Sequence, residues 1–312
     1  MIKKLVCFAL TTALMATIVC VPATVSATEA VSAKLETKPG TYYTYLNEFG
    51  AQETVKPNEN ISIDATLFAE SSGLGKECIL SEDAVILENT GDKLAFDVTI
   101  NQSGFYNISI NYAAIAANGS DIEYTLEIDG KTEFDGMKKL TLPRVYEIAE
   151  GDFPKDNRGN ELRPNQTEVQ MYREYVIEDA EGVVEKPYEF YLTEGTHNFA
   201  ITLQREKVAI TEIRIFNDAE LPNYAKPADL KENNAKPIIV EAEHAKYTTS
   251  SMLYPLSVMN DPNTTPSDPS LVRLNTIGGA NWVYPSQSLI WEFDVQTAGY
   301  RRSSLKVLKV AV

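Results

Sequence analysis

Cysteine and histidine are both scarce in this sequence, which has 3 cysteines and 2 histidines among 312 residues. Structural zinc sites need several such residues at short, regular spacings, and no spacing of that kind occurs here. Cys7 and Cys20 lie in an N-terminal segment that we expect to be removed, so Cys78 has no partner for an internal disulfide. Because Ile79 and Leu80 follow it, we expect Cys78 to be a buried, unreactive thiol.

The sequence also lacks the motifs of common enzyme classes. It contains no phosphate-binding loop and no dinucleotide-binding fingerprint. Neither His197 nor His244 accompanies a serine or cysteine in a recognisable nucleophile motif. Carboxylates are so abundant that a glycosidase pair cannot be identified from the sequence. We therefore expect a protein without catalytic activity.

Basic residues are outnumbered, with 28 Lys and Arg against 44 Asp and Glu and a formal net charge of -16 at pH 7. Such an excess of negative charge repels nucleic acid and anionic lipid. We expect no nucleic-acid partner, whereas neutral sugars and cations such as calcium remain compatible with this charge.

Residues 1–27 have the pattern of a secretory signal peptide. A basic start precedes an apolar run over residues 5–21, and Val25-Ser26-Ala27 offers a cleavage site. The alternative, a transmembrane anchor, is disfavoured because the run is shorter than the ~20 residues that a spanning helix needs. A secreted chain without disulfides is typical of bacteria, so we expect an extracellular protein of the bacterial cell surface.

One stretch of alternating residues occurs twice, at residues 94–104 and again at 289–299. Large apolar residues at every second position indicate a strand with one buried face. Each copy ends in glycine, and an aromatic residue follows. The aligned apolar residues are Leu94, Phe96, Val98 and Ile100 in the first copy, and Leu289, Trp291, Phe293 and Val295 in the second. Two copies suggest two related β domains.

The strand signals divide the chain after the leader. We predict a linker with a short packing segment over 28–57, a β-sandwich over 58–217, a second linker over 218–237, and an incomplete β-sandwich over 238–312. Asp129-Gly130 is expected to form a two-residue hairpin turn. The second sandwich has too few residues to be complete, which suggests a truncated or frame-shifted C-terminus.

An insertion over residues 143–187 interrupts the first sandwich. A long insertion of this kind is usually either a binding loop or an arm that packs domains together. Residues 156–161 are rich in Asp, Asn and Gly, and we expect them to form a turn stabilised by Asn and Asp side chains rather than a metal-binding loop.

Several short motifs resemble known sugar-binding proteins. Val240-Glu241-Ala242-Glu243, with the strand that ends in Ala298-Gly299-Tyr300, resembles the carbohydrate-binding modules of families 6 and 35. Residues 96–106 and 192–197 resemble the same galactose-binding-like group. Residues 159–164 are similar to the N-terminal extension of extracellular solute-binding proteins of bacterial sugar ABC transporters.

The resemblance implies an all-β fold, a galactose-binding-like jelly-roll β-sandwich with one complete domain and a second truncated copy. It implies an oligo- or polysaccharide ligand, and transporter membrane subunits as partners through a C-terminal domain that this sequence does not contain. In the resembling modules, the glutamates that match Glu241 and Glu243 contribute to a structural calcium site. If Glu241 and Glu243 lie two residues apart on a strand, both carboxylates face the same side and can bind one calcium ion. The alternative to a calcium site is an acidic strand edge exposed to solvent.

Sugar binding needs flat aromatic surfaces beside polar groups that form hydrogen bonds. In the second domain the candidates are Trp282, Tyr284 and Asn281, and in the first they are Tyr146 and Tyr172. For each aromatic residue the alternative is a packing role, and we assign Trp291 to the core. The sequence therefore predicts a secreted, non-catalytic carbohydrate-binding protein, the N-terminal part of an extracellular solute-binding protein of a sugar ABC transporter. The alternatives are a structural or adhesive β-sandwich module, and an accessory module of a secreted carbohydrate-active enzyme.

Overall fold

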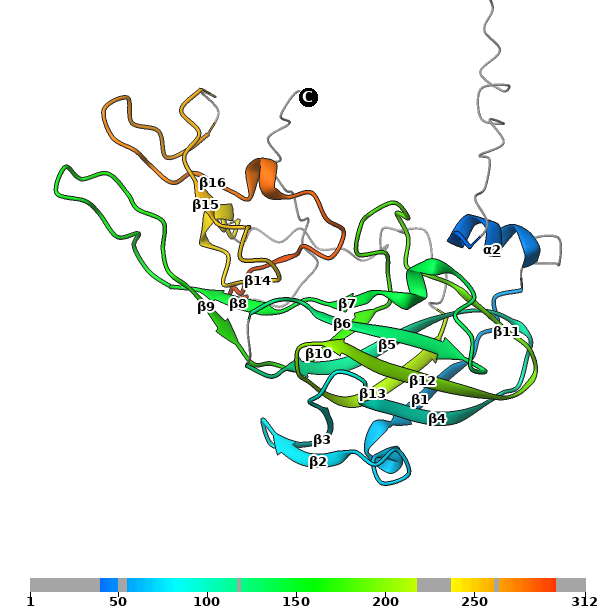
Figure 1. The fold of residues 1–312 in the computed structure, drawn as a ribbon. Helices are drawn as coiled ribbons and strands as arrows, with labels where there is room; N and C mark the ends of the chain where they lie inside the picture. Colours follow the sequence, from blue (N-terminus) through cyan, green and yellow to red (C-terminus); the bar gives the residue numbers. More distant parts are fainter. Residues whose placement is uncertain (1–39, 50–54, 117–118, 218–236, 261–263, 296–312) are drawn as a thin grey trace, which may run out of the picture. The chain divides into compact units, whose positions relative to one another are not determined.

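The computed structural model describes residues 40–49, 55–116, 119–217, 237–260 and 264–295. The predicted signal peptide, and residues 218–236 of the predicted linker, lie outside these ranges. The described residues form mostly antiparallel β-sheets (Figure 1). No helix among them is both long and apolar enough to cross a membrane.

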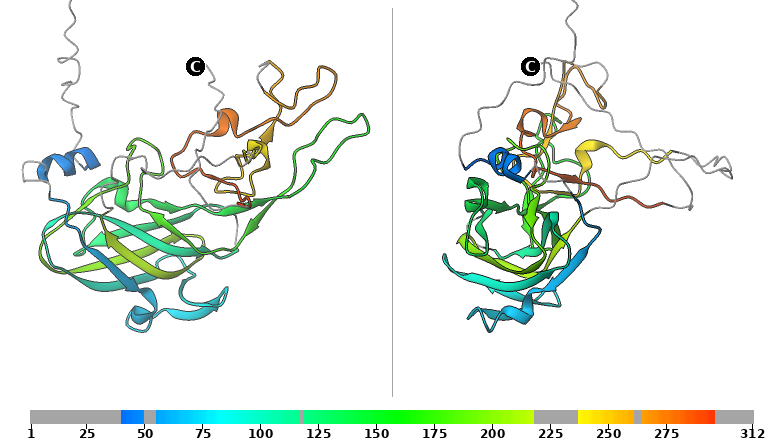
Figure 2. Two further views of the ribbon diagram at one scale, coloured as in Figure 1. Left: turned by 180° about the vertical axis from the view of Figure 1, so that it is seen from behind. Right: turned by 90° about the vertical axis from the view of Figure 1, so that its right-hand side faces the viewer.

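Two sheets form a β-sandwich (Figures 1 and 2). In the first, the order is β10-β5-β13-β3-β2, with β1 beside β13 and β11 beside β5. Its strands are β1 (Asn60–Asp64), β2 (Gly75–Ile79), β3 (Glu82–Leu87), β5 (Gly104–Ala114), β10 (Arg173–Val176), β11 (Phe190–Leu192) and β13 (Val208–Phe216). The second has the order β4-β12-β6-β7, with β4 (Lys93–Ile100), β6 (Ile122–Ile128), β7 (Leu140–Leu142) and β12 (Gly195–Arg205).

The core lies between these two sheets and follows the alternation predicted from the sequence. In β4 the side chains of Leu94, Phe96, Val98 and Ile100 are buried, and so are those of Tyr106, Ile108, Ile110 and Tyr112 in β5. A fully buried side chain of this size stabilises the folded state by about 1.5–3 kcal/mol. The prediction of a sandwich strand is therefore confirmed for the first copy of the repeated stretch.

The hairpin turn after β6 forms as its sequence predicts. Asp129 and Gly130 both have positive φ angles, of 52° and 72°. Ile128 and Lys131 exchange two backbone hydrogen bonds across them, at 2.9 and 3.0 Å. A two-residue turn with both central residues in this conformation matches the twist of the flanking strands, which is why Asp-Gly is favoured here.

A short helix, α2 (Tyr42–Phe49), packs on the sandwich through two tyrosines (Figure 1). Tyr42 and Tyr45 are buried, and their rings contact Phe134 of the sandwich. The hydroxyl oxygen of Tyr42 accepts a hydrogen bond from the amide of Glu189 at 2.8 Å, and that of Tyr45 accepts one from the amide of Tyr191 at 2.6 Å. These bonds join the helix to β11 and to the residue just before it.

Replacing Tyr45 by phenylalanine should lower the free energy of unfolding by about 1–2 kcal/mol. The change removes only the hydroxyl group and leaves the partly buried amide of Tyr191 without that acceptor. Urea denaturation followed by circular dichroism measures the effect. The matched control is Tyr43→Phe, because Tyr43 is exposed and its hydroxyl donates a longer bond, 3.3 Å, to the Val183 carbonyl. Equal effects of the two substitutions would contradict a docking role for Tyr45.

The C-terminal described segment joins the insertion in a separate sheet with the order β17-β14-β8-β9. Its strands are β8 (Val145–Ile148), β9 (Gln166–Val169), β14 (Tyr247–Thr248) and β17 (Leu289–Ile290). Between β14 and β17 in the chain, β15 (Pro255–Leu256) and β16 (Thr276–Ile277) form a separate two-stranded sheet. Because β14 pairs with β8, the part of the insertion from β8 to β9, residues 145–169, packs against the C-terminal segment. We call residues 145–169 the arm. Later in the insertion, β10 instead pairs with β5 and belongs to the sandwich.

The second copy of the repeated stretch does not form a sandwich strand within the described residues. Only Leu289 and Ile290 are paired, and Phe293 and Val295 are 58% and 50% exposed. A two-residue strand with one neighbour cannot bury a whole face of alternating side chains. The expected second β-sandwich is therefore not confirmed. Trp291, for which the sequence predicts a place in the core, is only partly buried. Its indole nitrogen donates a hydrogen bond to the Ala242 carbonyl at 3.0 Å.

The Asp- and Asn-rich loop of the arm forms the predicted turn. Oδ1 of Asp156 accepts hydrogen bonds from the amides of Arg158 and Asn160 at 2.8 and 2.9 Å, and Oδ2 accepts one from the side chain of Asn160 at 2.9 Å. The bond from the Asn160 side chain, followed by those from the backbone amides, lowers the pKa of Asp156. Glu161 then binds the C-terminal segment. Its carboxylate accepts hydrogen bonds from Arg273 and from the amide of Leu274, both at 2.9 Å. The turn thus places Glu161 in contact with Arg273, which lies 112 positions later in the chain.

The expectation that Cys78 is buried is wrong, since the structure places it exposed on β2. In the described sheet β2 pairs with β3 alone, and four of its five residues are exposed. Ile79 and Leu80, which suggested burial, lie at the start of the β2–β3 turn, where Leu80 and Ser81 both have positive φ angles and Leu80 is exposed.

Candidate functional site

A cleft of about 620 Å³ lies where the arm, the sandwich loops and the C-terminal segment meet. Tyr146 of β8 and Tyr284 both line it, and we call it the tyrosine cleft. Its other polar lining includes Ser120, Asp121, Arg205, Ser250, Asn281 and Gln287. The volume falls within the range of roughly 300–1,000 Å³ that is usual for small-molecule sites.

Strand pairing brings the two halves of the cleft together. Thr248 of β14 lies opposite Tyr146 of β8, so the residues after Thr248 continue along the edge of the cleft. Neither half of this pair carries a turn or motif that would identify its partner. The juxtaposition follows from pairing between distant segments.

Gln287 fixes the loop that carries Asn281 and Tyr284. Its side-chain oxygen accepts hydrogen bonds from the amides of Val283 and Tyr284 at 2.7 and 3.0 Å. Its side-chain nitrogen donates to the Asn281 carbonyl at 3.0 Å and to the hydroxyl of Ser250 at 3.2 Å. Because Gln287 is almost fully buried, these four bonds are shielded from water and hold the loop in one conformation.

The structure brings three of the predicted sugar-binding residues into this cleft, namely Tyr146, Asn281 and Tyr284. Trp282 is 46% exposed on the same loop but does not line the cleft. Tyr172 lies elsewhere, where it packs against a small apolar cluster that includes Ala84, Ile86, Ala113 and Ala209. Burial there raises the pKa of Tyr172 to about 12, as expected for a packing role.

Arg144, which contacts the cleft residue Ser120, is completely buried. Its guanidinium donates to the carbonyls of Ser120 at 2.5 Å and Ile115 at 3.1 Å, and it forms ion pairs with Glu168 and with Glu206, the latter at 2.9 Å. The sequence places Arg144 near candidate aromatics, but it gives no sign that three separate segments, the β5–β6 connection and those of Glu168 and Glu206, converge on this one side chain.

Asp121 and Arg205 are the charged residues that line the cleft. Arg205 is held by Glu123 at 2.8 Å, whereas Asp121 forms no ion pair with any described residue. Loss of water around the Asp121 carboxyl raises its pKa, although the Arg144 amide, which donates a hydrogen bond to it, and the charges of Arg144 and Arg205 act in the opposite direction. Sequence analysis did not single out Asp121, because no local motif marks it.

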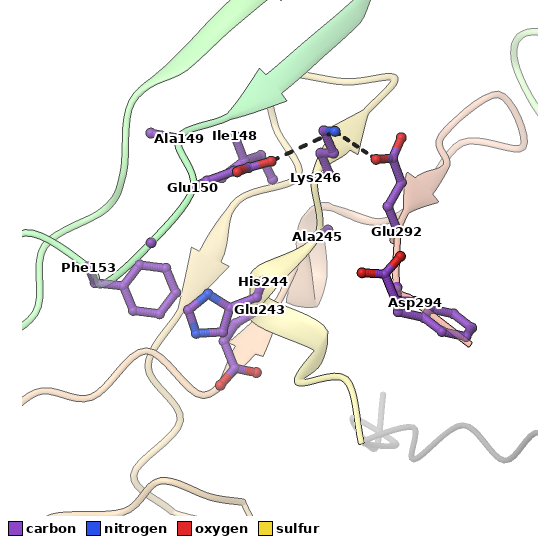
Figure 3. Close-up of a pocket in the computed structure, with 12 residues that line it drawn as sticks. Ile148, Ala149, Glu150, Phe153, Glu243, His244, Ala245, Lys246, Glu292 and Asp294 are labelled. Atoms are coloured by element: carbon purple, nitrogen blue, oxygen red, sulfur yellow. Dashed lines mark hydrogen bonds and ion pairs between the residues drawn. The ribbon is translucent and has the colours of Figure 1, made fainter. Parts of the chain in front are cut away.

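A second hollow, of about 640 Å³, is lined by residues at and after the end of β8, by residues 243–246 just before β14 and by residues 292–294 after β17. Because four of these residues, Glu150, Glu243, Glu292 and Asp294, are carboxylates, we call it the acidic pocket (Figure 3). In Figure 3, Lys246 lies between Glu292 and Glu150. The ammonium nitrogen of Lys246 is 2.6 Å from a carboxylate oxygen of Glu292 and 3.8 Å from one of Glu150. The ring of Phe153 stacks on that of His244, with centroids 4.6 Å apart. The Lys246 ammonium is thus already neutralised by carboxylates of the chain itself.

The structure does not place Glu241 and Glu243 on the strand from which their shared face was argued, and the calcium site stays a prediction. They do not lie on a strand, because Glu241 precedes a short 3-10 helix, η3 (Ala242–His244), so residues two apart do not share a face. Glu241 is exposed, whereas Glu243 is buried, and that burial raises the pKa of Glu243 and disfavours its charged form. Within the described ranges, no group of three or more His, Cys, Asp or Glu side chains could hold a metal ion.

The tyrosine cleft combines the groups that sugars need. Tyr146 and Tyr284 offer aromatic surface, and Asn281, Ser250 and Asp121 offer donors and acceptors for hydroxyl groups. The hydroxyl of Tyr146 donates to the Gly119 carbonyl at 3.3 Å, which orients its ring. Neither His197 nor His244 lines this cleft, so its described residues offer no imidazole for acid–base chemistry.

No protein-family model matches this sequence, and no curated protein matches it. Among solved structures, the chain is similar to the C-terminal family 6 carbohydrate-binding module of LamC, a marine laminarinase from Zobellia galactanivorans. The identity is 16% over 51% of this chain and 100% of the module, with a TM-score of 0.30.

Two further carbohydrate-binding modules are similar to about half of this chain. One is a module of the Cellvibrio mixtus lichenase 5A, solved in complex with cellotriose, with 18% identity, coverage of 51% of this chain and 98% of the module, and a TM-score of 0.31. The other is a family 35 module from Clostridium thermocellum, with 12% identity, coverage of 50% and 98%, and a TM-score of 0.29.

Proposed function

We propose that this protein is a secreted, non-catalytic carbohydrate-binding protein that binds an oligo- or polysaccharide in the tyrosine cleft. The observation that carries the proposal is the convergence of Tyr146, Asn281 and Tyr284 on one cleft. These residues come from two distant segments, and the chemistry of each side chain alone predicts a sugar-binding role. Packing roles would not require them to share an open, polar-lined hollow.

The wider setting that we propose is the N-terminal part of an extracellular solute-binding protein of a sugar ABC transporter. Its support is the resemblance of residues 159–164 to the N-terminal extensions of such proteins, together with the secretory pattern of residues 1–27. In that setting the cleft would capture glycan outside the cell, and the transporter membrane subunits would be reached through another part of the protein.

Replacing Tyr284 by alanine should weaken glycan binding at least tenfold, which corresponds to about 1.4 kcal/mol. Tyr284 is 53% exposed, so its loss removes aromatic surface from the cleft without opening a cavity in the core. Affinity gel electrophoresis on a panel of plant and bacterial polysaccharides, followed by calorimetry with the retained glycan, measures the change. Tyr43→Ala is the matched control, because Tyr43 is an exposed tyrosine on α2 that does not line the cleft.

Two results would count against the proposal. Folded wild-type protein that is retained by no polysaccharide would remove the carbohydrate-binding function and favour a structural or adhesive module. Retention that Tyr284→Ala and Tyr43→Ala leave equally unchanged would place the glycan somewhere other than the tyrosine cleft.

A further inference from the structure

Asp121 stands out among the groups that line the tyrosine cleft because its carboxylate is not used in an ion pair. It precedes β6 and lines the cleft together with Tyr146. The amide of Arg144 donates a hydrogen bond to this carboxylate. A carboxylate has about four acceptor positions, so Asp121 keeps free positions toward the cleft.

The other charges around Asp121 are satisfied within the protein. Arg205 is paired with Glu123, and the buried Arg144 is paired with Glu168 and Glu206. The exposed Lys139 lies 3.7 Å from Glu123. Around the cleft there are thus four carboxylates and three cations. The carboxylates are those of Asp121, Glu123, Glu168 and Glu206, and the cations are Lys139, Arg144 and Arg205. The full chain carries a formal net charge of -16. The cation among the described lining residues, Arg205, is therefore already paired with a carboxylate of the protein, whereas Asp121 forms no ion pair with any described residue.

We infer that the tyrosine cleft selects uncharged sugars and rejects uronic acids, with Asp121 as the residue that determines this specificity. The inference rests on the proposed function and names the class of its ligand. The two carboxylate oxygens accept hydrogen bonds from two adjacent hydroxyl groups of a neutral sugar, and bonds to a charged acceptor are stronger than neutral ones. A sugar carboxylate near Asp121 is repelled, because two like charges at short range raise the free energy of the complex.

The test compares sugars that differ only in charge. Cellotriose, mannotriose and galactotriose are each paired with the derivative in which the C6 alcohols are oxidised to carboxylates, and binding is measured by calorimetry and by NMR titration. With the wild-type chain, the neutral member of any pair that binds should bind at least tenfold more tightly than its uronate. Raising the salt concentration should narrow this gap by improving uronate binding, because salt screens the repulsion.

The substitution Asp121→Asn keeps the size of the side chain and removes its charge. It should weaken neutral-sugar binding several-fold and reduce the preference over the uronate at least fivefold. Asp83→Asn is the matched control, since Asp83 is an exposed carboxylate on β3 and does not line the cleft. The control removes the same charge from the chain and should leave the preference unchanged, and circular dichroism verifies that both variants are folded.

Equal binding of a neutral sugar and its uronate by the wild-type chain would overturn this inference while leaving the proposed function intact. A preference that Asp121→Asn does not alter would also overturn it, as would a gap that salt does not narrow. Failure of both members of every pair to bind would instead remove the proposed function, and this inference with it.

Discussion

Replacement of Arg144 by methionine should lower the free energy of unfolding by about 3–5 kcal/mol, the range found when one partner of a buried ion pair is removed. Methionine fills much of the same volume but removes the guanidinium that pairs with Glu206, whose side chain is 2% exposed. The carbonyls of Ser120 and Ile115 also lose their donors. Guanidinium denaturation gives the change, and the unfolding midpoint should fall accordingly.

The matched control for this prediction is Arg214→Met. Arg214 also pairs with a glutamate, Glu174, but both side chains are partly exposed, so the expected loss is about 1 kcal/mol or less. If the two substitutions cost the same, Arg144 would not act as the buried connection that the structure shows. Because Arg144 holds the Ser120 carbonyl at the edge of the tyrosine cleft, Arg144→Met should also weaken sugar binding, whereas Arg214→Met should not.

The sandwich could be predicted from the sequence because its signal is local. In β4 and β6 the inward side chains recur at every second position, and this period identifies both a strand and its buried face without reference to any partner. The turn at Asp129-Gly130 is local in the same way, since two positive φ angles are needed and those residues tolerate them.

The candidate site could be predicted only in part. Residue chemistry selected Tyr146 and Tyr284, but their meeting depends on the pairing of β14 with β8, and two-residue strands leave no periodic signal. Asp121 was missed for the same reason, because its place in the cleft follows from non-local contacts. Glu241 and Glu243 show the opposite error, since a spacing that would align them on a strand does not do so at a 3-10 helix.

The two copies of the repeated stretch test whether alternating apolar residues are enough to predict a buried strand. Phe96→Ala should cost about 3–5 kcal/mol in unfolding free energy, as is usual when a fully packed phenylalanine is removed from a core. Phe96 is 2% exposed, stacks on Phe199 with centroids 5.6 Å apart, and contacts Phe68 at 5.9 Å. Its β4 strand lies at the edge of the sheet, so the loss comes from the inter-sheet core.

Phe293→Ala removes the same side chain from the same face of the second copy, and it should change the unfolding free energy by no more than about 0.5 kcal/mol. Phe293 is 58% exposed and lies beyond the two paired residues of β17. The free energies of unfolding of the two variants are measured under identical conditions. Because the residue type and the alternating pattern are the same in both copies, a difference in cost reports whether the side chain is buried. A cost above about 2 kcal/mol for Phe293→Ala would mean that residues 289–295 pack as a buried strand after all. That result would restore the second β-sandwich which the alternation predicts and which the described residues do not form.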